Sequence, residues 1–380
     1  MIIIIALYNY ISGLKKYNVL VADIGGTHIR FKLLKMTKNP DDEIETIDTT
    51  RLKTSDYESL EVLLKEYLSN IATNYPEIAV IGVPGPIQDN KIMNLPNIPH
   101  WKKEDGNELG KILNIKKFLF LNDFACNSYG VQTKLVLNKD YSIINQGEPN
   151  PDGAIALLGP GTGLGMGYLM KNKNDKYYII GNSEGGHQFF ASKNKELFEL
   201  VEFVKKEYNL NYVIKENICS GQGMVPLYKF LLQKEIEEKG INGVERDKVL
   251  GERVDNFHNY SDKKTRDELS NEITIKGVKG ECPFSRKVVD YFIKILADIA
   301  TDLSFMIFPS NGIYLLGGIS VNLEPFIKET NNFMEYYLDN DLKFILKKFP
   351  IYLVKNGNIG MIGAAEAARR ILEKEEEKEK

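Results

Sequence analysis

The order of apolar and polar positions along the chain predicts strands and helices that alternate from end to end. In the first third, short apolar runs typical of strands occur at 19–24, 29–35, 78–83 and 117–121, with a helical spacing of apolar residues over 57–73. A second series follows, with a strand at 154–159, helices at 195–208, 225–239 and 286–308, and strands at 312–318 and 351–355. This alternation predicts an α/β protein.

The length of the chain predicts two lobes. At 380 residues it exceeds the size at which one hydrophobic core keeps growing. We expect a smaller α/β lobe from residues 1–130 plus 357–380 and a larger one from 131–356. Residues 236–280 are rich in charge without a sustained apolar period, so a solvated, partly helical insertion is predicted there.

Composition and charge narrow the class of partner. With 43% hydrophobic and 27% charged residues the chain can bury large cores in water, and a net charge of -3 gives no basic surface for nucleic acid. The three scattered cysteines are typical of a reducing compartment, so we expect a cytoplasmic protein. The apolar stretch at 1–8 is too short to span a bilayer, and we expect it to form an arm or an extra strand, with no membrane partner.

Two stretches share one plan of strand, glycine turn and strand, namely "VLVADIGGTHIRFKLLK" and "LLGPGTGLGMGYLM". Glycine turns let backbone N–H groups converge on an anion, and Thr27 and Thr162 would add hydroxyl donors. Two such turns on separate lobes could hold one polyphosphate, with Asp23 placed where Mg²⁺ of a bound nucleotide could lie. Either turn alone is explained equally well as a tight hairpin connection, and neither matches a familiar nucleotide motif.

Polar residues follow a buried strand in "FLFLNDFA", where Asn122 and Asp123 would face the crevice in which open α/β sheets bind ligands. A carboxylate there could accept a proton from an attacking hydroxyl. From the motif alone, helix capping is the favoured explanation. In "GNSEGGHQFF", Glu184 and His187 flank two glycines and could reach neighbouring hydroxyls of one ring, although a solvated Glu and a structural His explain the turn as well.

Six motifs in order resemble the bacterial-type glucokinases of the sugar kinase/Hsp70/actin superfamily, over residues 19–372. They are "DIGGTHIR", "LNDF", "GPGTGLG", "SEGGHQFF", "KENICSGQG" and "LLGGIS". The resemblance implies a two-lobed actin-like, ribonuclease H-like ATPase fold with the active site in the interlobe cleft. It also implies that Asp123 is the catalytic base, which reverses the preference for capping.

The resemblance assigns further residues. The first phosphate loop comprises Asp23, Gly25, Gly26, Thr27 and Arg30. The second comprises Gly161, Thr162 and Gly163, and the adenosine region contains Gly317 and Gly318. The sugar ligands are Asn97, Asn122, Asp123, Glu184, His187 and Glu216. His28 and Pro160 depart from the family pattern beside the phosphates, and could alter ATP affinity.

The activity implied is ATP-dependent phosphorylation of glucose to glucose 6-phosphate, the entry step of glycolysis. Mg²⁺ would be held mainly by the ATP phosphates with Asp23 nearby, rather than by a protein metal site, and a homodimer is expected. The alternatives are a hexose kinase of broader specificity and a non-catalytic sugar sensor. The related repressor-type sugar kinases bind zinc through a cysteine cluster, and "KGVKGECPFS" contains only Cys282.

Overall fold

The computed structural model describes residues 15–25, 27–71, 74–95, 98, 100–101, 104–133, 140–181 and 183–379. Contacts between Cα atoms divide the chain into two compact units, unit 1 being Met1–Lys139 with Asn358–Lys380 and unit 2 being Asp140–Gly357. The boundaries between the units therefore lie after residues 139 and 357. The sequence predicts them after residues 130 and 356. The apolar stretch at 1–8 lies outside the described residues.

Unit 1 is built on a five-stranded sheet in the order β3-β2-β1-β4-β7. The strands are β1 (Tyr17–Ile24), β2 (His28–Met36), β3 (Glu45–Lys53), β4 (Ile78–Val83) and β7 (Lys117–Asn122). The first three pair antiparallel, and β1, β4 and β7 run parallel. Every residue of β4 is buried, as expected for a central strand with helices on both faces.

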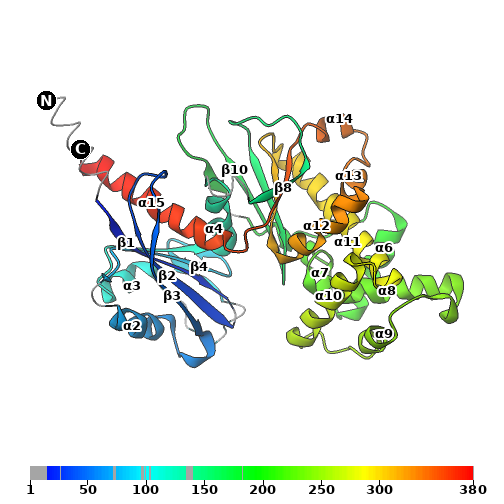
Figure 1. Cartoon of the computed structure of the whole chain (residues 1–380). Helices are drawn as coiled ribbons and strands as arrows, with labels where there is room; N and C mark the ends of the chain where they lie inside the picture. Colours follow the sequence, from blue (N-terminus) through cyan, green and yellow to red (C-terminus); the bar gives the residue numbers. More distant parts are fainter. Residues whose placement is uncertain are drawn as a thin grey trace. The chain divides into compact units, whose positions relative to one another are not determined.

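Helices cover both faces of this sheet (Figure 1). On one face lie α2 (Leu60–Asn70) and α3 (Gly106–Ile112), and on the other lie α4 (Asp123–Gly130) and α15 (Ile359–Glu379). Successive residues of β1 alternate between the two cores, with Leu20 and Ala22 on the α2 side and Val19 and Val21 on the α15 side. A small hairpin, β5 (Ile87–Gln88) and β6 (Lys91–Ile92), precedes α3.

Unit 2 repeats the strand plan of unit 1 in a six-stranded sheet, β11-β10-β9-β12-β13-β8. The strands are β8 (Tyr141–Asn145), β9 (Ile155–Pro160), β10 (Leu164–Met170), β11 (Ile179–Gly181), β12 (Ile313–Leu315) and β13 (Ile351–Val354). Here β9, β10 and β11 form the antiparallel part, β9, β12 and β13 run parallel, and β8 is added at the edge. The two glycine hairpins therefore join equivalent strands, β1 to β2 and β9 to β10.

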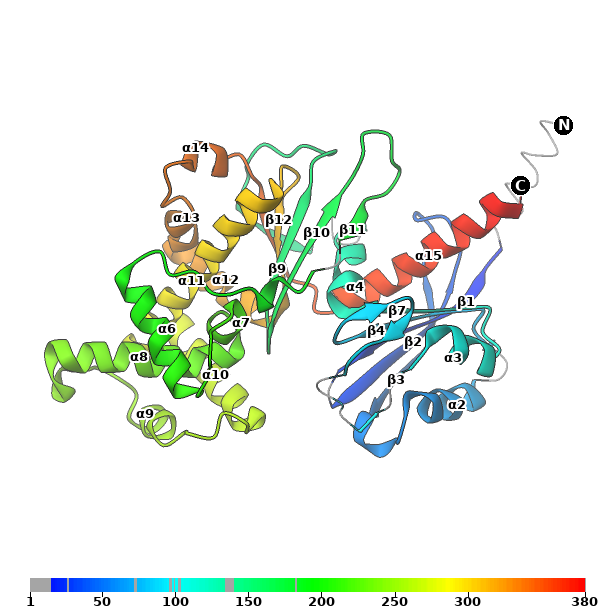
Figure 2. The same cartoon turned by 180° about the vertical axis from the view of Figure 1, so that it is seen from behind.

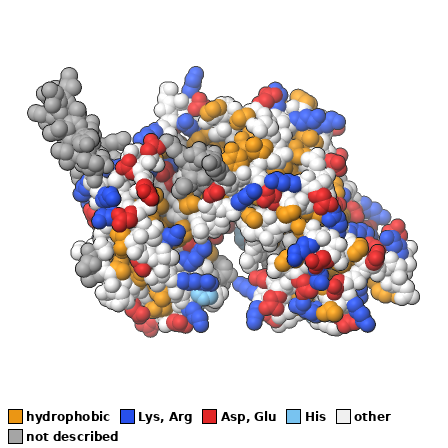
Figure 3. All heavy atoms as spheres, in the orientation of Figure 1, with side chains coloured by type: hydrophobic (Ala, Val, Ile, Leu, Met, Phe, Trp, Pro, Cys, Tyr) orange, Lys and Arg blue, Asp and Glu red, His pale blue; other side chains and the backbone are white. Residues whose placement is uncertain are grey.

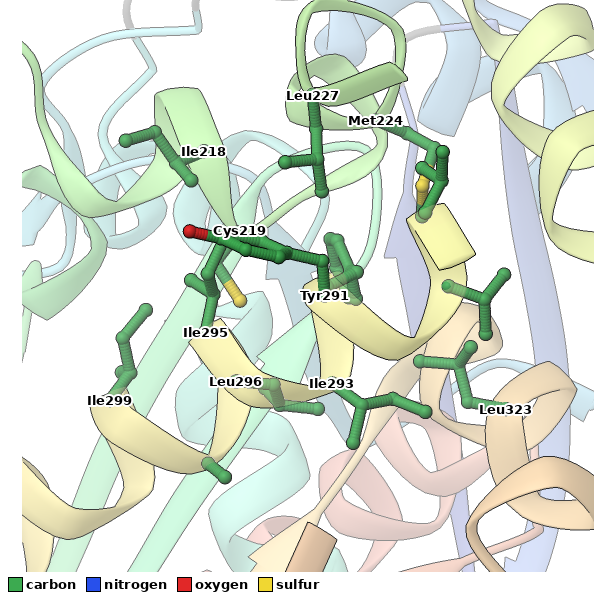
Figure 4. Packing of buried hydrophobic residues seen from close by; sticks show 14 of the residues in the cluster. Ile218, Cys219, Met224, Leu227, Tyr291, Ile293, Ile295, Leu296, Ile299 and Leu323 are labelled. Carbon is green, nitrogen blue, oxygen red and sulfur yellow. The ribbon is translucent and has the colours of Figure 1, made fainter. Parts of the chain in front are cut away.

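The helices of unit 2 gather into one core (Figure 2). They are α6 (Lys195–Glu207), α7 (Lys215–Ile218), α8 (Gly221–Lys239), α9 (Lys248–Asp255), α10 (Lys263–Val278), α11 (Pro283–Ile307), α12 (Gly317–Thr330), α13 (Asn332–Tyr337) and α14 (Lys343–Leu346). The long α11 forms the centre of this core, where its apolar side chains pack with Ile218, Leu227 and Leu323 (Figure 4).

The stretch 236–280 is partly helical, as predicted, and most of its residues are exposed or half-buried, but it also contributes residues to the core. Leu250 and Val254 of α9 and Leu269 and Ile273 of α10 are fully buried and belong to the unit 2 core. Their spacing gives each helix one narrow apolar stripe among charged residues. The composition does not reveal these buried stripes, because a narrow stripe is diluted when the whole stretch is considered.

Basic and acidic side chains are interspersed over the visible face of each unit (Figure 3). Of the helices in the described ranges, none combines the length and the apolar character needed to cross a bilayer.

The crossing of α4 and α15 depends on glycines. A Cβ on Gly363 would lie 1.7 Å from the Cys126 carbonyl oxygen, and one on Gly130 would lie 2.5 Å from the Ile359 carbonyl oxygen. On the same helix, a Cβ on Gly360 would meet only Asn127 Oδ1, at 3.4 Å. The backbones at Gly363 are thus too close for any side chain.

We therefore predict that Gly363→Ala lowers the free energy of unfolding by about 3 kcal/mol or more, because the new methyl group forces the two helices apart. Gly360→Ala is the matched control and should leave stability unchanged or raise it by up to about 1 kcal/mol, since Ala favours a helix over Gly. Urea unfolding monitored by circular dichroism measures both. Equal stability of the two variants would contradict this account of the crossing.

Candidate active site

The first glycine hairpin, between β1 and β2, is closed by a hydrogen bond from Gly25 N to the His28 carbonyl oxygen at 2.8 Å. Asp23 and Arg30 face each other across the two strands, and Arg30 Nη2 lies 2.5 Å from Asp23 Oδ2. Arg30 Nη1 also lies 3.5 Å from Asn358 Oδ1, just before α15. The predicted first-loop residues Asp23, Gly25 and Arg30 are therefore brought together.

The tip of this hairpin is open to solvent. Thr27 is exposed, and its carbonyl oxygen accepts from Thr54 N at 3.1 Å, which ties the turn to the end of β3. The imidazole of His28 lies 3.2 Å from Arg51 Nη2, measured at Nδ1. Gly26 lies outside the described residues.

Asn122 and Asp123 have different roles at the start of α4. Asn122 Oδ1 accepts from Phe124 N at 2.9 Å and from Ala125 N at 3.3 Å, so Asn122 is the helix cap. Its Nδ2 donates to the Gly85 carbonyl oxygen at 3.0 Å. Asp123 is the first helical residue and is exposed, and its Oδ1 accepts from Phe124 N at 2.7 Å. The capping interpretation is correct for Asn122, whereas Asp123 presents a carboxylate to solvent.

Asp23 and Asp123 lie at the same edge of the unit 1 sheet. The parallel register aligns Asp23 with Gly82 and Gly82 with Leu121, two residues before Asp123. Adjacent strands are about 4.8 Å apart, so the strand ends that carry the two carboxylates are separated by about 10 Å. This edge is formed by the carboxyl ends of β1, β4 and β7, where ligands of such sheets bind.

A buried thiol lies beneath these two carboxylates. Cys126 is 1% exposed, and a Cβ on Gly82 would lie 3.1 Å from its Sγ, so the thiol packs directly on β4. Burial raises the pKa of the Cys126 thiol above its usual range, and the negative charges of Asp23 and Asp123 raise it further. The thiol is therefore protonated and adds no charge below the carboxylates.

The second glycine hairpin is closed by a backbone hydrogen bond between residues two apart, whereas the bond that closes the first joins residues three apart. Gly161 N donates to the Gly163 carbonyl oxygen at 2.8 Å, and Thr162 is exposed at the tip. Apart from the adjacent residues, a Cβ on Gly161 would have only the Gly163 carbonyl oxygen within 4 Å of it, at 4.0 Å. This hairpin too can present backbone N–H groups to an anion.

Two helix N-termini converge on the second hairpin. At the start of α8, Gly221 N donates to the Gly161 carbonyl oxygen at 2.7 Å. At the start of α12, Gly317 has φ of +87°, and a Cβ there would lie 2.6 Å from the Pro160 carbonyl oxygen. Gly317 and Gly318 are both exposed. Helix N-termini carry partial positive charge, so the arrangement favours a bound anion.

Glu216 of α7 lies against the same hairpin. Its Oε2 accepts from Leu164 N at 2.9 Å, and its Oε1 accepts from Gln222 Nε2 at 2.9 Å. A Cβ on Gly163 would lie 2.5 Å from Oε2, so only glycine leaves room for this carboxylate. Glu216, a predicted sugar ligand, therefore also contacts the turn that is predicted to bind phosphate.

Glu184 and His187 flank the 3₁₀ turn η3 (Gly185–His187), and both are exposed. The turn is packed on β10, because a Cβ on Gly186 would lie 2.1 Å from the Leu164 carbonyl oxygen. Since Leu164 N also binds Glu216, the turn and α7 meet at the same residue. Unit 2 therefore brings together Glu184, His187 and Glu216, whereas the predicted sugar ligand Asn97 lies outside the described residues.

Sequence reasoning missed Gln222, which holds Glu216. Its position in "KENICSGQG" carries no periodic signal, because α7 ends and α8 begins between the two residues. Within the part of the chain that the structure describes, there is no group of three or more His, Cys, Asp or Glu side chains that could hold a metal ion.

Comparison with known proteins gives a consistent result. The family model described as Glucokinase matches residues 20–371. The glucokinase of Nostoc sp. strain PCC 7120 is 29% identical over 358 residues, covering 93% of this chain and 99% of the relative. The crystal structure of a glucokinase from an Antarctic psychrotroph superposes with a TM-score of 0.72 at 25% identity, covering 92% of this chain and 98% of the other.

The fold similarity extends to more distant kinases. The glucokinase of Balamuthia mandrillaris in complex with glucose gives a TM-score of 0.70 at 18% identity, covering 97% of this chain and 98% of the other. These similarities confirm the predicted two-unit, actin-like α/β fold.

The buried cysteines generate a prediction. Cys126, Cys219 and Cys282 are all buried, and burial raises the pKa of the first two thiols. We expect none of the three to react rapidly with Ellman's reagent at pH 8 in the native protein, because all three are shielded from the reagent by burial and the thiolate form of Cys126 and Cys219 is also scarce. All three should react after denaturation in guanidinium. Rapid reaction of Cys126 in the native protein, identified by mass spectrometry, would contradict the packing at Gly82.

Proposed function

Since the chain belongs to the glucokinase family, we propose that it transfers the γ-phosphoryl group of ATP to the 6-hydroxyl of glucose, forming glucose 6-phosphate and ADP. The observation that carries the proposal is the glycine hairpin found at equivalent strands of both sheets. Each hairpin ends beside groups suited to one half of the reaction, carboxylates in unit 1 and helix N-termini in unit 2.

The donor side of the proposal uses both hairpins. Backbone N–H groups of Gly26 and Thr27 in the first loop and of Thr162 and Gly163 in the second would bind phosphate groups of the donor, while the N–H groups of Gly25 and Gly161 close the two turns. The N-termini of α8 and α12 would add partial positive charge, and the exposed Gly317 and Gly318 would leave space for adenosine. Arg30, held by Asp23, would supply a full positive charge at the first loop.

Mg²⁺ fits this donor set as a cation held mainly by phosphate oxygens, since Asp23 offers carboxylate oxygens and Mg²⁺ sites in kinases combine one or two carboxylates with substrate phosphates. When bound, Mg²⁺ would neutralise charge on the β- and γ-phosphates.

The acceptor side uses Glu184, His187 and Glu216 as hydrogen-bond partners of the hexose ring, with Asn97 and Asn122 as further ligands. Glu216 is well suited to this role, because an ionised carboxylate can accept about four hydrogen bonds and two of its bonds are made within unit 2. Asn122 Oδ1 accepts two hydrogen bonds and Nδ2 donates one within the protein, so its contribution to sugar binding would be made with the second N–H of Nδ2.

Asp123 would act as the general base. Its exposed carboxylate would accept the proton of the 6-hydroxyl while that oxygen attacks the γ-phosphorus. We place the reaction in the cytoplasm at the entry to glycolysis, with a homodimer as the working form, on the resemblance to the family.

The substrate range is tested by measuring ADP release with a panel of hexoses and phosphoryl donors. A high kcat/KM for glucose and no other hexose, with ATP as the donor, supports a glucokinase. A kcat/KM for mannose or glucosamine similar to that for glucose supports the hexose kinase of broader specificity. Glucose binding without turnover would support the sensor.

Asp123→Asn tests the base. We expect kcat to fall by at least about 100-fold, because Asn cannot take a proton, while glucose affinity changes much less. Asp105→Asn is the matched control, since Asp105 also stands at a helix start in unit 1, where it caps α3 by accepting from Asn107 N at 2.8 Å. It should keep nearly full activity. More than about a tenth of wild-type turnover in Asp123→Asn would exclude the base role.

Gly161→Val tests the second loop. A Cβ there would meet only the Gly163 carbonyl oxygen, at an uncrowded 4.0 Å, so we expect normal folding but a KM for ATP raised by at least about tenfold, with a smaller effect on the KM for glucose. Gly357→Val is the control, because a Cβ there meets nothing within 4 Å. Equal changes in both Michaelis constants would count against a triphosphate at this loop.

A further inference from the structure

Glu216 is held at both carboxylate oxygens before any ligand arrives. Leu164 N donates to Oε2 and Gln222 Nε2 donates to Oε1, each at 2.9 Å. The first donor belongs to the backbone of β10 and cannot be exchanged, whereas the second is a side chain. The direction of the remaining lone pairs of Glu216 therefore depends on Gln222.

Gln222 is itself fixed by an unusual feature of α8. Pro226, four residues further along the helix, has no N–H and cannot donate to the Gln222 carbonyl oxygen. The hydroxyl of Tyr208, at the end of α6, donates to that carbonyl oxygen instead. The backbone of Gln222 is thus anchored from another helix, and its side-chain amide extends from this anchor to Glu216.

We infer that Gln222 is a positioning residue for hexose binding, one that acts through Glu216 and determines how its carboxylate meets the hydroxyls of the sugar. The inference rests on the proposed function, since it takes Glu216 as a sugar ligand. A neutral amide suits this task, because it donates to the carboxylate without cancelling the negative charge that binds hydroxyl protons.

The ionisable groups around Glu216 come from four elements. They are Glu184 and His187 at η3, Lys215 of α7, Tyr208 at the end of α6 and Asp302 of α11 near Lys215. The Lys215 ammonium lies 3.0 Å from Gln188 Oε1 and 3.7 Å from Asp302 Oδ2, and Glu184 and His187 are exposed. The side chain that donates to Glu216 Oε1 is the neutral amide of Gln222.

Replacing this amide by a carboxyl makes the contact depend on pH. In Gln222→Glu two carboxylates would face each other, which raises the pKa of one of them. At pH 8 both are ionised and repel, so we expect glucose to bind at least about tenfold more weakly than in the wild type. At pH 5.5 one shared proton restores a donor to Glu216, and the difference from the wild type should shrink to about threefold or less.

Gln233→Glu is the matched control. Gln233 lies on the same helix, is exposed, and donates to Glu237 Oε1 at 2.8 Å, so the substitution creates the same carboxylate pair away from the site. It should bind glucose as the wild type does at both pH values. Gln222→Met keeps the length of the side chain but removes the donor, and should weaken glucose binding by about tenfold at both pH values.

Calorimetric titration of glucose into the full-length proteins, with melting temperatures as a check of folding, decides the matter. Wild-type affinity in Gln222→Glu at pH 8, or an equal loss at both pH values, would overturn the positioning role, as would wild-type affinity in Gln222→Met. Failure of the wild type and Gln233→Glu to bind glucose would instead overturn the proposed function.

Discussion

Close contact between backbones is the constraint on which the candidate site depends. A Cβ on Gly363 would lie 1.7 Å from the Cys126 carbonyl oxygen, one on Gly186 would lie 2.1 Å from that of Leu164, and one on Gly317 would lie 2.6 Å from that of Pro160. These glycines let α15 cross α4, η3 pack on the start of β10 and α12 begin against the end of β9. With any side chain at these positions the paired elements would be forced apart, and the groups that α4, η3 and α12 carry would move with them.

The two units use one strand plan for different electrostatic tasks. In unit 1 the strand ends carry Asp23 and Asp123 above a neutral thiol, so the edge of the sheet is negative apart from Arg30. In unit 2 the equivalent edge receives the N-termini of α8 and α12, which are positive, and one carboxylate whose oxygens are both bonded. A phosphate is therefore favoured at the second hairpin, whereas proton transfer and contact with a cation are favoured near the first.

The sequence predicts those parts of the fold that have a strong local signal. The buried strands β1, β4, β7 and β9 appear as apolar runs, and α11 as a long apolar period. The strand β3 has no buried residue and reads as polar, so its place at the sheet edge is decided by pairing with β2. The hairpins of the site are visible as glycine patterns, but the hydrogen bonds of Glu216 join α7 to β10 and α8, and no local pattern encodes them.

In the charged stretch 236–280, buried residues support the candidate site although the composition of the stretch does not reveal them. Within α10 the buried positions include Ser270 and Thr274, which lower the apparent apolar character of the helix. Ser270 Oγ donates to the Gly221 carbonyl oxygen at 2.5 Å, and Gly221 N donates to the Gly161 carbonyl oxygen. The Ser270 hydroxyl thus gives the Gly221 carbonyl oxygen, in the first turn of α8, a buried donor from another helix. Helix α10, whose composition predicts exposure to solvent, thus contacts the N-terminus of α8, which in turn meets the second hairpin. The polar residues of α10 are buried because they face this N-terminus.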